Sequence, residues 1–176
     1  MNIWHDLSED RVSDKEFTAF IEITKGSKAK YELDKETGML MLDRILSTSM
    51  VYPANYGFIP RTLSEDGDPL DVLLLCSENI ASMSLVECKP LAVIKMVDGG
   101  ENDEKIVAVC KSDKFYNQFN KLSDLPKHVY DEMVHFFESY KALENKHCEI
   151  NGVEDEESAK QIINEAIARY KEKYVK

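Results

Sequence analysis

The stretch EDGDPLDVLLL, residues 65–75, joins a compact acidic turn directly to an apolar run. Gly67 and Pro69 favour a tight turn, because glycine accepts positive φ and proline fixes its own φ. The apolar run Val72–Cys76 is far too short to span a bilayer and has the length of a buried strand. We therefore expect an acidic loop that is held at the edge of a β-rich core.

Asp66, Asp68 and Asp71 crowd three carboxylates into six residues. Carboxylates this close repel one another, which raises their pKa values unless cations neutralise them, and magnesium is a hard cation that prefers such oxygen ligands. A calcium-binding EF-hand loop is excluded, because Leu70 and Asp71 occupy the fifth and sixth loop positions and Ser77 the twelfth. The whole pattern favours a metal site, although a DxD pair alone is more typical of a solvated turn.

Further strands are predicted where apolar residues alternate with polar ones or form short runs. The predicted strands are Thr18–Ile23, Lys30–Leu33, Met39–Ile45, Leu91–Val97 and Ile106–Cys110. Asp34–Gly38 reads as a hairpin loop between the second and third of these strands. The aromatic segment VYPANYGFIP, residues 51–60, is interpreted as a rigid loop that covers the core, because its prolines exclude a regular helix.

The last third of the chain predicts two helices. Helical spacing in the first relates Val129, Met133, Phe136, Phe137, Tyr140 and Leu143, with Ser123 and Asp124 as N-cap candidates. In the second, the apolar face holds Ile162, Ile163, Ala166, Ile167 and Tyr170, and the acids Asp155, Glu156 and Glu157 suit its N-terminus. Strands followed by helices indicate a single α+β domain over residues 1–176, and many short strands favour a small barrel with flanking helices.

Composition narrows the classes of function. The chain has 176 residues and a net charge of −11, and its basic residues form no continuous patch, which argues against nucleic-acid or anionic-membrane binding. The N-terminus has no signal-peptide pattern, so we expect a cytoplasmic protein. The four cysteines, Cys76, Cys88, Cys110 and Cys148, form no CxxC pair and are interpreted as reduced, mostly buried thiols, with a zinc site as the alternative.

Other charged residues have an ordinary interpretation when each is taken alone. Asp98 and Asp103 flank a second acidic turn, and two such turns at strand ends could face each other across one opening. Lys30 and Glu32 share one face of a strand, and Glu22 alternates with its apolar neighbours, as on the solvent side of a sheet. Arg44 would be a surface ion-pair partner of Asp43, and Tyr140 a core residue with Lys141 projecting elsewhere.

The ordered set of these fragments resembles the family I inorganic pyrophosphatases of the bacterial type. The fragments are IEI (21–23), KYE (30–32), DR (43–44), YPANYG (52–57), DGDPLD (66–71), KMxD (95–98) and HFFExYK (135–141). The resemblance covers nearly the whole chain, from about Trp4 to the last helix. It implies a five-stranded OB-like barrel with flanking helices, magnesium-dependent hydrolysis of pyrophosphate to two phosphates, and a homohexamer.

The resemblance also implies a role for each site residue. Several magnesium ions, with manganese or zinc as substitutes, would be held by Asp66, Asp71, Asp98, Asp103, Glu22 and Glu32. Phosphate oxygens would be bound by Lys30, Arg44, Lys105, Tyr140 and Lys141. Tyr56 would lie beside the nucleophile, and Asp68 would act as general base.

Two residues depart from the family pattern, and two alternative functions stay open. Gly99 stands where members of the family often have an acid, and Ser139 where a histidine often occurs at a subunit contact. The same barrel could serve as a catalytically idle metal-binding module, because fold does not fix function. A hydrolase for a larger phosphoanhydride such as a nucleotide is the other alternative, although the chain has no glycine-rich phosphate loop.

Overall fold

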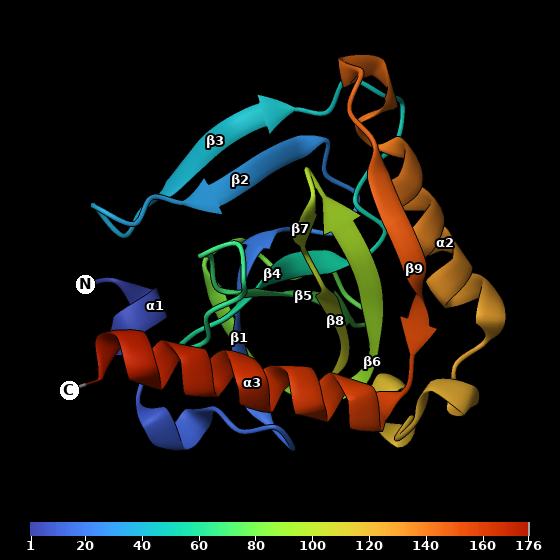
Figure 1. Ribbon diagram of the computed structural model, residues 1–176. Helices are drawn as coiled ribbons and strands as arrows, with labels where there is room; N and C mark the ends of the chain where they lie inside the picture. Colours follow the sequence, from blue (N-terminus) through green and yellow to red (C-terminus); the bar gives the residue numbers. More distant parts are fainter. Residues whose placement is uncertain (176) are drawn as a thin grey trace.

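The computed structural model describes residues 1–175 and is built around a closed ring of five strands (Figure 1). Their order around the ring is β1 (Phe17–Ile23), β4 (Asn55–Ile59), β5 (Leu70–Leu75), β8 (Lys105–Cys110) and β6 (Ser84–Asp98). The pairing of β6 with β1 closes the ring, and every pair is antiparallel except β5 with β8. The prediction of an α+β protein with a five-stranded OB-like barrel is confirmed.

The other elements extend this ring or cover it. Two strands, β7 (Glu101–Asn102) and β9 (Cys148–Glu154), pair with β6. The β2–β3 hairpin, made of β2 (Ala29–Leu33) and β3 (Leu40–Ile45), is a separate two-stranded sheet that lies above the barrel in Figure 1. The helices are α1 (Ile3–Asp6), α2 (Lys127–Ser139), α3 (Glu156–Tyr174) and the short 3-10 turns η1 (Glu9–Arg11), η2 (Tyr116–Gln118), η3 (Leu122–Asp124) and η4 (Ala142–Glu144).

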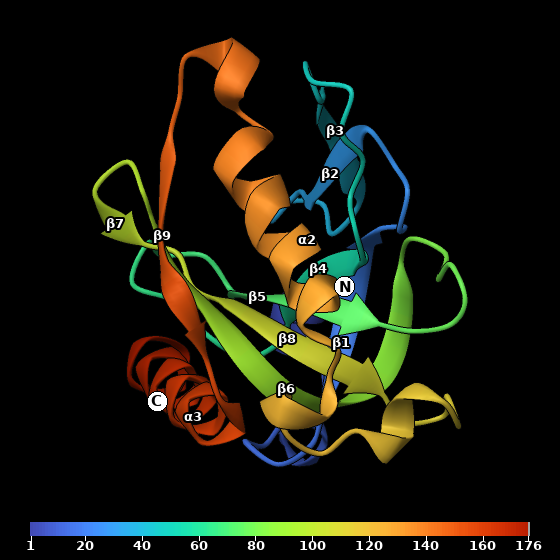
Figure 2. The same ribbon diagram turned by 90° about the vertical axis from the view of Figure 1, so that its right-hand side faces the viewer.

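Strands β5 and β8 are buried on both faces, which explains their continuous apolar sequences. On one face, Val72 and Ile106 belong to a cluster that includes Ile163 of α3. On the other face, Leu73 and Val107 belong to a cluster that includes Phe136 and Phe137 of α2. Figure 2 shows α2 and α3 on different sides of the barrel.

The barrel depends on a close approach of β1 and β4 at Gly57. A Cβ atom at this position would lie 1.8 Å from the carbonyl oxygen of Phe20, which is far inside van der Waals contact. Gly57 pairs with Ile21 across the two strands. Only glycine lets the backbones approach this closely, so the Gly in YPANYG is required by packing.

Three predictions and one missed strand need correction. Asn55–Ile59 is strand β4 and not part of a loop, because its backbone pairs with β1 and β5. Strand β9 was not predicted, although its first four residues, Cys148 to Asn151, alternate in polarity. Helix α2 begins after the N-cap Pro126 and ends at Ser139, so neither Ser123 nor Asp124 caps it. Asp124 instead closes the preceding turn, and Leu143 is 69% exposed in η4.

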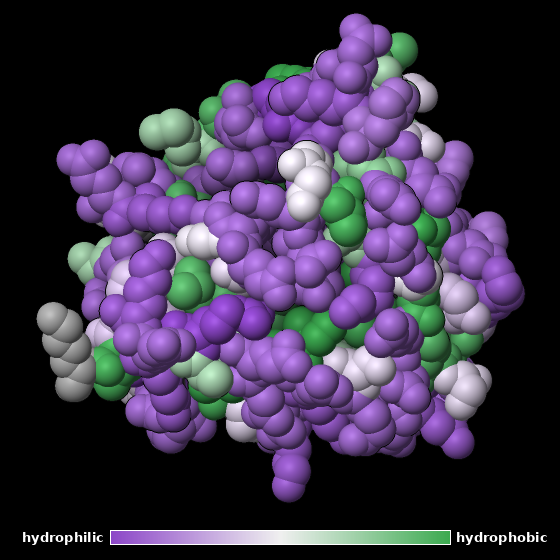
Figure 3. All heavy atoms as spheres, in the orientation of Figure 1, coloured by the Kyte–Doolittle hydropathy of each residue, from purple (hydrophilic) through white to green (hydrophobic). Residues whose placement is uncertain are grey.

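The surface and the helices add two observations. Hydrophilic side chains cover most of the face between the hairpin and α3, with apolar areas that are small and separate (Figure 3). No helix within residues 1–175 has an apolar stretch of the length that a membrane crossing requires.

Candidate active site

A cavity of about 410 Å³ lies between the β2–β3 hairpin, the acidic loop, one end of the barrel and the end of α2. All thirteen residues to which the sequence assigned a role line this cavity. They are Glu22, Lys30, Glu32, Arg44, Tyr56, Asp66, Asp68, Asp71, Asp98, Asp103, Lys105, Tyr140 and Lys141. The fold therefore brings together residues from seven strands, two loops and the segment after one helix.

The barrel wall of the cavity is built around a buried lysine. Lys105 starts β8 directly beside Asp71 of the parallel strand β5. Its Nζ donates to Asp71 Oδ2 at 2.5 Å and to Asp103 Oδ1 at 2.6 Å, and the ammonium also faces the rings of Tyr56 and Phe137. Burial alone would lower the pKa of Lys105, but the two carboxylates outweigh it and raise that pKa, so the lysine is charged.

Glu22 reaches the same wall through a bulge in β1. The register between β1 and β4 shifts between Ile21 and Ile23, and Glu22 is the extra residue. Glu22 is 7% exposed, and its carboxylate accepts the backbone N–H of Leu33 at 2.8 Å. Burial, reinforced by the charges of Asp71 and Glu32, raises the pKa of Glu22 to about 8. The solvent-facing position expected from simple alternation is therefore wrong.

The acidic loop has a defined backbone. The N–H of Ser64 donates to the carbonyl of Asp68 at 2.7 Å, and the N–H of Asp68 donates to Asp66 Oδ1 at 3.0 Å. Gly67 has φ +88°, as the turn requires. Partial burial and then the nearby charges, including those of Asp103 and Asp68, raise the pKa of Asp66 to about 6. This carboxylate has no lysine or arginine partner among the described residues.

The hairpin wall of the cavity carries a chain of ion pairs. Lys30 and Arg44 face each other across β2 and β3, and Asp43 is the extra residue in a bulge beside them. Lys30 Nζ bonds Glu32 and also Asp43, the latter at 3.0 Å. Arg44 contacts Asp43 at 3.0 Å, so the ordinary ion-pair expectation for this arginine is confirmed.

The second acidic turn and the end of α2 form the remaining wall. Gly99 and Gly100 both have positive φ, which allows the tight connection between β6 and β7. Lys141 Nζ donates to Asp98 Oδ2 at 2.5 Å. This contact outweighs the effect of burial and holds the pKa of Asp98 below its usual value. Tyr140 is 5% exposed, as expected of a core residue, yet it also lines the cavity.

Sequence reasoning gave no site role to five polar or aromatic residues of the cavity lining, which are Trp4, Tyr31, Lys35, Asp43 and Phe58. Asp43 had been considered only as a partner of Arg44, Trp4 had no assigned role, and Lys35 lies in the hairpin loop. Lys35 makes an ion pair with Asp68 and places its ammonium 5.4 Å from the centre of the Trp4 ring. The adjacent pair Asp43-Arg44 could have identified Asp43 as a site residue, but no local sequence pattern indicates a role for Lys35 or Trp4.

The charge balance of the cavity suits divalent cations. Its lining contains eight carboxyl groups and five lysine or arginine side chains, which leaves three negative charges in excess when every carboxyl group is ionised. No group of three or more acidic, histidine or cysteine residues within 1–175 lies in a metal-holding arrangement, and Lys105 occupies the space between Asp71 and Asp103. The donors are nevertheless hard oxygens, and Asp66 is left without a cation, so the donor chemistry fits magnesium.

Comparisons with known proteins agree with this geometry. The family model described as inorganic pyrophosphatase matches residues 19–171. The "Inorganic pyrophosphatase" of Halalkalibacterium halodurans is 48% identical over 160 residues, or 91% of this chain and 98% of the relative. The "Soluble inorganic pyrophosphatase 2" of Chlamydomonas reinhardtii is 45% identical over 172 residues, or 98% of this chain and 90% of the relative.

Solved structures give the same result. The inorganic pyrophosphatase of Helicobacter pylori superimposes with a TM-score of 0.89 at 41% identity, covering 94% of this chain and 99% of the other. That of Thermus thermophilus gives a TM-score of 0.92 at 36% identity, covering 97% and 99%. The family model, the sequence relatives and the shared fold lead to one conclusion: the chain belongs to the inorganic pyrophosphatases, hydrolases that act on pyrophosphate.

Proposed function

We propose that this chain hydrolyses inorganic pyrophosphate to two phosphates in a magnesium-dependent reaction in which water attacks in line. The observation that carries the proposal is the combination, in one cavity, of excess carboxylates with five lysine or arginine side chains. Pyrophosphate is a small polyanion, so a site for it needs cations on every side. The carboxylates would recruit divalent ions, and the basic side chains would contact phosphate oxygens directly.

In this proposal the metal ligands are the acids of both turns and of β1 and β2. Asp66, Asp71, Asp98 and Asp103 would hold the ions, and Glu22 and Glu32 would contact them or their waters. When bound, magnesium supplies a water of lowered pKa and neutralises phosphoryl charge. Manganese and zinc would substitute for it. The ion pairs of Lys105 with Asp71 and of Lys141 with Asp98 would then open, which would free each lysine to contact the substrate.

The basic side chains would position the two phosphates. Lys30, Arg44, Lys105 and Lys141 approach the cavity from different elements, and Tyr140 adds a hydroxyl donor. Arginine suits this task because its fork can bind two phosphate oxygens at once. These groups would hold the leaving phosphate in line and stabilise the charge that develops in the transition state.

Asp68 would act as the general base. It lies at the turn of the acidic loop between Asp66 and Asp71, and its side chain is 57% exposed, so it is free to take a proton and pass it to solvent. Tyr56 is buried in the barrel wall beside Lys105 and would flank the nucleophile. Lys35 pairs with Asp68 and must release it before the base can act.

Phosphate release from pyrophosphate tests this function directly. The protein is assayed with magnesium across a concentration series, then with excess chelator, and beside ATP as the control substrate. Rapid release from pyrophosphate that depends on magnesium, with little release from ATP, is expected. A folded sample that releases no phosphate from pyrophosphate with any divalent ion would overturn the proposal.

We further infer, from the resemblance, a cytoplasmic hexamer. The hairpin supports an assembly, because Met39, Met41, Leu42 and Ile45 are each at least 50% exposed on or beside β3. Exposed large apolar side chains that are close together are typical of protein contacts. Light scattering after size-exclusion chromatography measures the mass, and a concentration-independent monomer would contradict the assembly.

A further inference from the structure

The end of the short turn η4 contacts the hairpin at Arg44. Arg44 Nε lies 3.1 Å from Glu144 Oε1, and the two side chains are 27% and 20% exposed. The contact is an ion pair rather than a hydrogen bond, because Arg44 Nε has no hydrogen-bond partner of suitable geometry within residues 1–175. Glu144 itself does not line the cavity, so any effect on substrate must act through another residue.

The turn that carries Glu144 is fixed on both sides. The N–H of Glu144 donates to the carbonyl of Lys141 at 3.0 Å, which closes η4 directly after α2. Asn145 follows with φ +53° in the left-handed region, where asparagine is tolerated better than most residues. Glu144 therefore presents its carboxylate from a short, hydrogen-bonded turn three residues after Lys141, whose ammonium is in the cavity.

The hairpin, in contrast, has no strand pairing to the barrel. Arg44 needs other contacts to hold its guanidinium toward the cavity, and Asp43 is the immediate neighbour on the same strand. Glu144 is the contact that comes from a different part of the fold. Its second oxygen, Oε2, is buried and has no hydrogen-bond partner among the described residues, so Arg44 is the cation that compensates this carboxylate.

We propose that Glu144 is a positioning residue for Arg44. It holds the Arg44 guanidinium in a fixed position relative to the substrate-contacting residues that follow α2. The inference rests on the proposed function, in which Arg44 binds phosphate oxygens. Loss of the Glu144 charge would leave the guanidinium of Arg44 held only by Asp43 of its own strand, and therefore less ordered. An arginine that must be ordered again at each binding event weakens substrate affinity more than it slows the chemical step.

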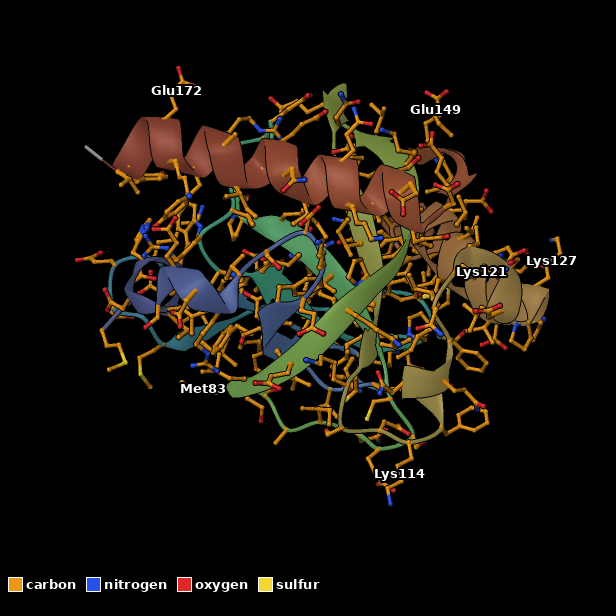
Figure 4. The ribbon with its side chains drawn as sticks, turned by 90° about the horizontal axis from the view of Figure 1, so that it is seen from below. Met83, Lys114, Lys121, Lys127, Glu149 and Glu172 are labelled. Atoms are coloured by element: carbon orange, nitrogen blue, oxygen red, sulfur yellow. The ribbon has the colours of Figure 1, made fainter. Side chains whose placement is uncertain are left out.

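The test is a set of steady-state measurements with pyrophosphate and saturating magnesium. Glu144→Gln keeps the shape and removes the charge, and we expect KM to rise about three- to tenfold while kcat changes less than about twofold. Glu144→Asp keeps the charge and should recover part of the loss. Glu149→Gln is the matched control, because Glu149 lies on β9, is exposed and points away from the molecule in Figure 4. It should leave both constants unchanged.

A double-mutant cycle separates positioning from a general structural effect. In an Arg44→Ala background, Glu144→Gln should raise KM by less than about twofold, because the residue it acts on is absent. An equal rise in both backgrounds, or an unchanged KM in Glu144→Gln alone, would overturn the inference. Thermal unfolding checks that each variant is folded. If Glu144→Gln is not folded, the KM of Glu144→Asp provides the test instead.

A second readout distinguishes this inference from the proposed function. Inorganic phosphate binding is measured by calorimetry in the presence of magnesium, for the wild type, Glu144→Gln and Glu149→Gln. Weaker phosphate binding in Glu144→Gln alone supports the positioning role without any turnover. If the wild type releases no phosphate from pyrophosphate, the proposed function fails, and the same phosphate result still supports or overturns the role of Glu144.

Discussion

The barrel wall and the hairpin wall of the cavity hold the same kinds of charge in different ways. On the barrel wall, Lys105 has a 4% exposed side chain and lies between two carboxylates, over aromatic rings and beside the core. On the hairpin wall, Lys30 has a 16% exposed side chain and pairs with acids of its own two-stranded sheet. Charges on the first wall are fixed by the fold, whereas those on the second are fixed mainly by each other.

The two walls therefore differ in how much their ion pairs contribute to the stability of the fold. A buried ion pair on a barrel strand must be satisfied for the chain to fold, because an unpaired buried charge is strongly destabilising. A pair on a peripheral hairpin contributes little to stability and can open when substrate arrives. The barrel wall should therefore govern stability and its pH dependence, and the acidic loop and hairpin should govern catalysis and affinity.

The largest effect is expected at Asp68, where a substitution should affect catalysis but not stability. Asp68→Asn should lower kcat by about a hundred- to ten-thousandfold, because general base catalysis is lost, while stability stays within about 0.5 kcal/mol of the wild type. Steady-state kinetics and thermal unfolding measure the two quantities. A variant with normal kcat would exclude Asp68 as the base.

The second-largest effect is a difference in stability between variants of Lys105 on the barrel wall and Lys30 on the hairpin wall. Lys105→Met leaves Asp71 and Asp103 without their buried partner, and it should cost about 3–5 kcal/mol in the free energy of unfolding when chelator is present. Lys30→Met, as the matched variant on the hairpin, should cost less than about 1 kcal/mol. Urea unfolding gives both values. Equal costs would show that the two walls do not differ.

The third effect is a pH dependence caused by Glu22. Its folded pKa of about 8 lies above the ordinary value of 4.5, so the folded state binds the proton more tightly than the unfolded state does. Between those two pH values Glu22 therefore costs the wild type stability as pH rises, and Glu22→Gln removes that contribution. In chelator, Glu22→Gln should match the wild type near pH 4.5 and exceed it by roughly 4 kcal/mol at pH 8. A difference between the two that does not change with pH would contradict the buried, raised-pKa carboxyl.

The smallest effect is expected at the tip of the hairpin. The Lys35–Asp68 pair has side chains that are 50% and 57% exposed, so Lys35→Ala should change stability by less than about 0.5 kcal/mol. In the proposed function Lys35 must release Asp68 before this base can act, so its removal should not abolish turnover. Thermal unfolding and steady-state kinetics of the variant check this. A loss of activity as large as that of Asp68→Asn would make Lys35 part of the catalytic machinery.

Several features followed from the sequence because they depend on neighbours along the chain. The turn at Gly67 and Pro69, the apolar strand after Asp71, and the apolar faces of α2 and α3 are local patterns with local causes. The ordered motifs also identified the family, and all thirteen predicted site residues line one cavity. Their individual roles stay predictions.

Other features depend on residues that are distant in the sequence, so the tertiary structure decided them. The bulge in β1 places Glu22 inside, against the expectation from alternation. Asn55–Ile59 becomes a strand because β1 and β5 provide hydrogen-bond partners on both sides. Lys35 reaches Asp68, and Glu144 reaches Arg44, across separations that no local pattern encodes. The sequence determined which chemical groups are available, and the closed barrel with its hairpin determined which of them meet.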